Sequence, residues 1–291
     1  EMSASLVGSE MCIRDSRREH RKFDIIGGIM NACFFFLLIG LIEGASHELS
    51  GHVLLVGLGL LIVVGTIFVR RELHREFPLL PIDLLRIPIF SMSVSTSVFS
   101  FMAQMLAMVS LPFFLQGELG KDEVTCGLLM TPWPLATMIC APLAGILAER
   151  VNAGLLGGIG LTIFACGLFL LSMLDSSATA GDIVWRMALC GGGFGLFQTP
   201  NNSTIIASAP RNRSGGASGM LGTARLLGQT SGAALAALLF RLIPGGHNTH
   251  NSLLVGCAIA IVAAMVSLTR LGRQTGPKLD RLAQQQANTP K

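Results

Sequence analysis

Eight stretches of mostly apolar residues, each about as long as a bilayer-spanning helix, follow one another along the chain. A spanning helix needs about 20 apolar residues to cross about 30 Å of hydrocarbon. The stretches are residues 23–45, 52–69, 91–115, 124–147, 153–173, 183–207, 218–242 and 252–269. Because only short polar connectors separate them, consecutive helices are expected to be antiparallel neighbours. The sequence therefore predicts an all-α integral membrane protein with no soluble domain.

The scarcity of charge supports this fold class. Only 13% of the residues are charged, whereas soluble domains carry about 25%. The net charge of +4 raises the alternative of a nucleic-acid partner. However, the basic residues form short clusters between apolar runs and build no basic face, so no nucleic-acid binding is predicted.

The basic clusters also predict the orientation of the chain. Most of the 21 Lys and Arg residues fall in alternate connectors, and such an excess marks the cytoplasmic side of a membrane protein. The opposite side holds Lys121, with Arg186 and Arg241 at its helix ends. Both termini are therefore predicted to be cytoplasmic.

One connector divides the chain into two helices followed by six. It carries three prolines and four arginines within residues 70–88. At the start of the chain, residues 5–16 (SLVGSEMCIRDS) resemble a translated sequencing-adapter tail. We therefore expect the natural chain to begin near Arg17 and a preceding portion to be missing. The predicted parts are a non-native tail (1–16), two linker helices (17–70), a cytoplasmic loop (71–88), a six-helix half (89–272) and a cytoplasmic tail (273–291).

Catalytic chemistry finds little support in this sequence. The apolar runs hold almost no carboxylates or histidines, and all six histidines lie in connectors or at span ends. His247 and His250 have a ligand-like spacing, but in a short loop we interpret them as a solvated pair. Six cysteines lie in apolar runs without a C-x-x-C pair, and we interpret them as small buried apolar residues. No catalytic, cofactor or metal site is predicted; a membrane enzyme and a channel remain alternatives.

The sixth span carries an unusual set of glycines and amides. Gly191 and its neighbouring glycines predict close contact with another helix, because membrane helices associate through packing. Gln198, Asn201 and Asn202 place amides on a helix that Pro200 weakens. Buried amides in hydrocarbon need hydrogen-bond partners or a water-filled cavity. Cavity lining and interhelical hydrogen bonding both remain open for these residues.

Two further residues within spans allow a functional and a structural reading. Arg225 lies about 10 Å into its helix, where an arginine can snorkel or pair with helix-end carbonyls, or can serve gating. Trp133 lies between Pro132 and Pro134, which predict a kinked span. Trp133 either faces a cavity or packs against a neighbouring helix.

Several segments resemble the fourteen-span drug:proton antiporters (EmrB/QacA type) of the major facilitator superfamily. Residues 141–154 (APLAGILAERVNAG) resemble its cytoplasmic loop signature through Gly145, Glu149 and Arg150, although aspartate is usual where Glu149 stands and no basic pair follows Gly154. The other similar segments are residues 77–90, 197–210 and 214–234. The resemblance implies a major facilitator fold fragment, with two extra helices followed by the six-helix C-terminal half.

The resemblance also implies a function and a set of partners. It predicts export of bulky lipophilic, often cationic, drug-like compounds in exchange for protons from the inner membrane of a bacterium. The spans offer no mid-span carboxylate, so the acids that couple protons are expected in a missing N-terminal six-helix half. The alternative is a truncated fragment that transports nothing without such a half.

The expected contribution of the chain is one wall of a substrate cavity. Candidates for this wall are Phe99, Phe101, Gln104, Phe113, Trp133, Phe197, Gln198, Asn201 and Asn202. Candidates for gating are Gly145, Glu149, Arg150 and Arg225.

Overall fold

The computed structural model describes residues 25–46, 50–73, 82–210, 213–242 and 248–270. Every regular element within these ranges is a helix. The predicted tails at 1–16 and 273–291, and residues 74–81 of the predicted loop, lie outside the described residues. The predicted all-α membrane fold is confirmed.

Each apolar run of the sequence corresponds to helical structure. The elements are α2 (Ile25–Ser46), α3 (Gly51–Leu73), the short 3-10 helix η1 (Ile82–Arg86), α4 (Pro88–Gly117), α5 (Glu123–Met130), α6 (Pro132–Ala148), α7 (Ala153–Ser172), α8 (Ala180–Ser208), α9 (Ser214–Leu242) and α10 (Asn248–Thr269). The fourth run forms two helices, α5 and α6, because the helix is interrupted at Thr131, just before Pro132. Proline lacks the amide hydrogen that would continue the ladder.

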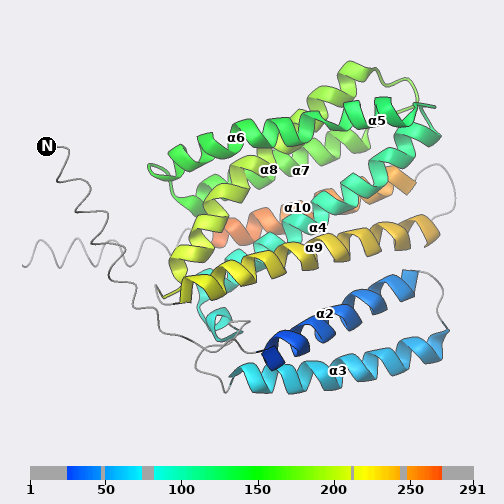
Figure 1. The fold of residues 1–291 in the computed structure, drawn as a ribbon. Coiled ribbons are helices and arrows are strands. Elements are labelled where there is room, and N and C mark those ends of the chain that lie inside the picture. Colours follow the sequence, from blue (N-terminus) through cyan, green and yellow to red (C-terminus); the bar gives the residue numbers. More distant parts are fainter. Residues whose placement is uncertain (1–24, 47–49, 74–81, 211–212, 243–247, 271–291) are drawn as a thin grey trace, which may run out of the picture.

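The helices run side by side along one common direction (Figure 1). α8 packs between α6 and α7, α10 packs between α7 and α4, and α4 in turn packs against α9. α4 also contacts α8, which closes the group. α2 and α3 pack on each other and lie beside this group, with α2 against α9 (Figure 1).

Four segments of the described chain are long and apolar enough to span a membrane, fewer than the eight predicted. They are Pro88–Gly117, Glu123–Ala148, Ala153–Ser172 and Asn248–Thr269. α8 and α9 have 29 residues each, so their length suffices, but amides, glycines and an arginine make them less apolar. In α2 and α3 the apolar portions are shorter, at Ala32–Leu41 and Gly51–Ile67.

Large apolar side chains on the outer helix faces fit a lipid environment. Ile139 and Ile146 of α6 are more than 60% exposed, as are Phe36 of α2 and Val56 of α3. Contiguous apolar surface of this kind is rare on soluble monomers.

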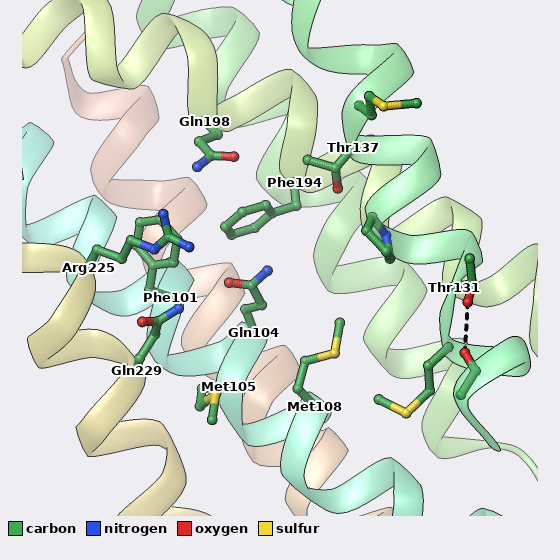
Figure 2. A pocket seen from close by; sticks show the side chains of 14 residues that line it. Phe101, Gln104, Met105, Met108, Thr131, Thr137, Phe194, Gln198, Arg225 and Gln229 are labelled. Atoms are coloured by element: carbon green, nitrogen blue, oxygen red, sulfur yellow. Dashed lines mark hydrogen bonds between the residues drawn. The ribbon is translucent and has the colours of Figure 1, made fainter. Parts of the chain in front are cut away.

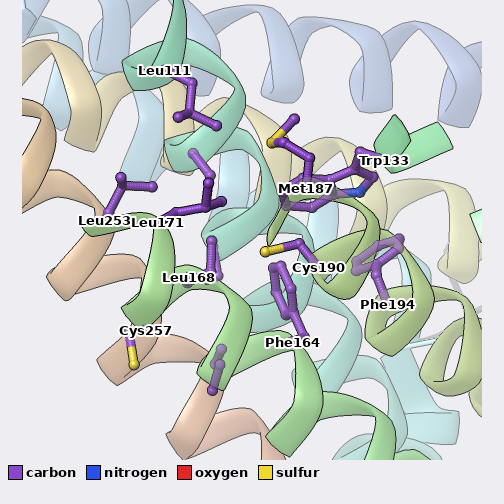
Figure 3. Close-up of a cluster of buried hydrophobic side chains, with 14 of the residues drawn as sticks. Leu111, Trp133, Phe164, Leu168, Leu171, Met187, Cys190, Phe194, Leu253 and Cys257 are labelled. Carbon is purple, nitrogen blue, oxygen red and sulfur yellow. The ribbon is translucent and has the colours of Figure 1, made fainter. Parts of the chain in front are cut away.

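Aromatic rings form the centre of the six-helix group (Figure 3). The ring of Phe164 in α7 lies edge-on to Trp133 of α6, at 5.5 Å, and to Phe194 of α8, at 5.7 Å. Phe101 of α4 contacts Phe194 in the same way at 5.4 Å. Edge-to-face pairs suit the charge distribution of aromatic rings, so this chain of contacts joins four helices.

Glycines let α8 approach both of its neighbours, as the sequence predicted. A Cβ at Gly191 would lie 2.1 Å from the carbonyl oxygen of Trp133, and one at Gly193 would lie 2.5 Å from the amide nitrogen of Phe164. Real Cβ atoms do not approach so closely, so only glycine fits at either place. Gly228 and Gly232 let α9 approach α4 in the same way, because a Cβ at Gly232 would lie 2.4 Å from the carbonyl oxygen of Met102.

The cysteines follow the sequence prediction only in part. Cys126, Cys190 and Cys257 are buried, whereas Cys33 and Cys166 are exposed. The prediction of burial was wrong for these last two, because an apolar run does not indicate which face of a helix meets lipid and which meets protein.

Candidate substrate cavity

A cavity of about 630 Å³ opens on one side of the six-helix group, between α4, α5, α6, α8 and α9. α4 lines it with Phe101, Gln104, Met105 and Met108, whose spacing puts them on one helix face. Such a volume is typical of a site for a small organic ligand.

The lining is divided into a polar part and an apolar part. Figure 2 shows Arg225 and Gln229 of α9 with Gln104 of α4 on one side, and Met108 farther across. Gln198 of α8 adds a third amide to the lining. Phe194 lies between the two parts (Figure 2). The cavity can therefore accept both hydrogen-bonding groups and an apolar body.

Arg225 lies deeper than the sequence suggested. α9 begins at Ser214, so Arg225 is about 16 Å along the helix axis at 1.5 Å per residue. Its guanidinium carbon lies 5.4 Å from the ring centre of Phe101, a distance at which a cation is attracted to an aromatic face. The side chain thus lies over Phe101 and lines the cavity.

The other predicted wall residues lie in different surroundings. Trp133 and Phe197 are each 1% exposed and belong to the aromatic core, and Phe99 packs against that core. Phe113 is 58% exposed and pairs with Phe240 of α9, at 4.8 Å between ring centres. None of these four lines the cavity described above, and neither does the half-buried Asn202.

Asn201 lies in a buried polar network. Of the two alternatives that the sequence left open, cavity lining and interhelical hydrogen bonding, the structure therefore shows the second for this residue. Its amide nitrogen donates to the hydroxyl of Ser97, at 2.8 Å, and to the carbonyl oxygen of Ser93, at 3.2 Å, both in α4. Its amide oxygen accepts from the guanidinium of Arg270, at 2.7 Å. Asn201 is 1% exposed.

Arg270 completes this network, although nothing in the sequence had singled it out. It is 1% exposed and also donates to the hydroxyls of Ser93, at 2.7 Å, and Ser267, at 2.6 Å. Ser267 in turn donates to the carbonyl oxygen of Gly154, at 3.1 Å. The network therefore ties α4, α7, α8 and the end of α10 together.

Burial lowers the pKa of Arg270 to about 10, so the guanidinium keeps its charge near neutral pH. A buried charge needs hydrogen-bond partners to offset its desolvation. The two hydroxyls and the amide oxygen provide them. No signal in a single sequence separates this arginine from the other basic residues near the end of the chain.

The predicted gating residues at the end of α6 are not brought into the cavity. Glu149 and Arg150 are exposed beside the turn into α7. A Cβ at Gly145 would meet Thr199 only at 3.7 Å, an ordinary contact, so this glycine does not mark a close helix crossing. A different charged pair joins η1 to the start of α9: Arg213 donates to both carboxylate oxygens of Asp83.

Gln229, Met105 and Met108 were missed as lining residues. Helical spacing held the signal: Gln229 follows Arg225 by four residues, and the two methionines lie on the helix face of Phe101 and Gln104.

Comparison with known proteins shows which family has this helical bundle. Residues 23–233 match the Major Facilitator Superfamily, and residues 92–290 match it in a second, overlapping alignment. The chain belongs to this superfamily. Membership places it among transporters rather than enzymes.

Similar proteins include two described as transporters and one described as an efflux pump. The chain is 58% identical over 256 residues to the uncharacterized transporter YebQ of Escherichia coli, covering 88% of this chain and 56% of that protein. It is 27% identical over 222 residues to the multidrug efflux pump LfrA of Mycolicibacterium smegmatis, covering 75% and 43%. It is 26% identical over 223 residues to the riboflavin transporter RibZ of Clostridioides difficile, covering 76% and 48%. The chain thus spans about half the length of these relatives.

Proposed function

We propose that this chain is the C-terminal part of a proton-coupled, fourteen-span exporter of lipophilic drug-like compounds. The observation that carries the proposal is the open cavity, whose wall combines methionines and phenylalanines with three glutamine amides. A wall of this kind binds diverse ligands, because methionine adapts its shape and amides both donate and accept. The similarity to a multidrug efflux pump and to a tetracenomycin C export protein supports export.

Alternating access needs a second wall, and we propose that a further six-helix half supplies it. The cavity is open to one side, where such a half would cover it. Its lining contains no aspartate or glutamate within the described chain. The carboxylates that exchange protons therefore belong to that half in this proposal, as does any preference for cationic drugs. Both termini would face the cytoplasm, with the protein in the bacterial inner membrane.

The test is efflux of a neutral lipophilic dye, such as Nile red, from energised cells that make the complete transporter. We expect efflux to stop when an ionophore collapses the proton gradient. Gln104→Ala and Gln198→Ala should change the efflux rate several-fold. The matched control is Gln116→Ala, an exposed residue of α4 outside the cavity lining.

Efflux that persists without a proton gradient would overturn proton coupling. Equal efflux by the Gln104, Gln198 and Gln116 variants would remove the cavity from the transport route.

A further inference from the structure

We propose that this cavity selects lipophilic aromatic compounds that carry an acidic group, and that Arg225 binds that group. This inference rests on the proposed export function and names the substrate class of the same site. It differs from the cationic preference that the family resemblance implied.

Arg225 lies near the middle of the 29-residue helix α9, far from either end, and it lines the cavity. A charge at such depth is costly in a membrane protein and marks a substrate or ion pathway by default. The side chain therefore acts where a substrate would be held.

Arg225 lines the cavity and contacts an aromatic ring, a contact that uses none of its N–H donors. The guanidinium carbon lies over the ring of Phe101, 5.4 Å from the ring centre. A contact between a guanidinium and an aromatic ring holds the side chain in place. The N–H donors form a fork that matches a carboxylate or sulfonate in two parallel hydrogen bonds.

Neighbouring amides complete a site for an acidic group. Gln229 lies one helical turn after Arg225 and lines the same cavity, and Gln104 faces them from α4 (Figure 2). Each amide offers two further N–H donors. Asp and Glu are absent from the lining within the described chain, so no carboxylate of this wall competes with a ligand for Arg225.

The remainder of the cavity suits an apolar body attached to the acidic group. Met108 and Phe194 line the space beyond Gln229 and Gln104, and Met105 lies beside these two amides (Figure 2). A cation at the same place would face the charge of Arg225 in surroundings that screen charges weakly. The wall thus favours anions over cations of the same shape.

The experiment compares three probes that share one ring system: 2-naphthoate, 2-naphthylmethanol and 2-naphthylmethylammonium. Proton-driven transport of each is measured in proteoliposomes that hold the complete transporter. We expect the anion to be transported with the highest kcat/KM. Arg225→Gln should reduce the anion-to-alcohol ratio roughly tenfold or more, since hydrogen bonds to charged groups are of that size.

Two variants serve as controls. Arg225→Lys keeps the charge but loses the fork, so it should retain part of the anion preference. Arg241→Gln removes the same charge from the last turn of α9 and should leave the ratio unchanged.

The outcomes separate this inference from the proposed function. If Arg225→Gln slows the anion and the neutral alcohol equally, Arg225 serves coupling or folding and the inference fails. Equal transport of anion and cation by the unchanged protein also overturns it, while export itself stands. If no lipophilic compound is moved by the proton gradient, the proposed function fails first.

Discussion

The guanidinium of Arg270 donates a 2.7 Å hydrogen bond to the amide oxygen of Asn201, 69 residues earlier in the chain. Both side chains are 1% exposed. Asn201 passes the connection on to α4 through Ser97 and the carbonyl oxygen of Ser93. Because every one of these polar groups is buried, removing one member leaves another without a partner.

We therefore predict that Asn201→Ala lowers the free energy of unfolding by about 2 to 3 kcal/mol, the cost of an unpaired buried group next to a charge. Thermal melting of the detergent-purified transporter should show a lower Tm. Asn202→Ala is the matched control, because Asn202 is the next residue and only half-buried. Equal melting of the two variants would contradict a structural role for the network.

The glycines of α8 offer a sharper comparison between adjacent residues. A Cβ at Gly191 would meet the carbonyl oxygen of Trp133 at 2.1 Å, whereas one at Gly192 would meet only the sulfur of Cys140 at 3.4 Å. Gly191→Ala should destabilise the protein by about 2 to 3 kcal/mol through overpacking. Gly192→Ala should be neutral or stabilising by up to about 1 kcal/mol, the helix propensity difference. Equal melting temperatures for the two variants would contradict the close contact between α6 and α8.

The same test applies to the contact between α4 and α9. A Cβ at Gly232 would lie 2.4 Å from the carbonyl oxygen of Met102, and no atom lies within 4 Å of one at Gly222. We expect Gly232→Ala to impair both melting temperature and transport, and Gly222→Ala to impair neither. A stable and active Gly232→Ala protein would mean that α9 shifts freely on α4.

The ion pair between Asp83 and Arg213 predicts rescue by charge exchange. Arg213 donates to both carboxylate oxygens, with 3.1 Å between Nη2 and Oδ1. The pair is partly exposed, so its stabilising energy should be about 1 kcal/mol or less. Asp83→Arg and Arg213→Asp should each lower the melting temperature slightly, and the double variant should recover it. Losses that simply add in the double variant would show that the two side chains act independently.

The sequence by itself determined the membrane class, the number of helical runs and several contacts between helices. Length and apolarity suffice for helices in lipid, because every backbone group must find its partner within the segment. Gly191 and its neighbouring glycines predicted close approaches, because a residue without a side chain lets another backbone come near. Gln104, Gln198 and Arg225 were recognised as polar residues within spans, where burying a polar side chain costs free energy and indicates a functional role.

Only the tertiary structure decided which way each polar side chain faces. Gln198 lines the cavity, whereas Asn201, three residues later, is buried against α4 and Arg270. Nothing in the sequence distinguishes Arg270 from other cations, and only the fold shows that Ser93, Asn201 and Ser267 surround it. The periodicity of one helix fixes which residues share a face, but the partner of that face comes from helices distant in sequence. For a polar group in a membrane, that partner determines whether it stabilises the fold or meets a substrate.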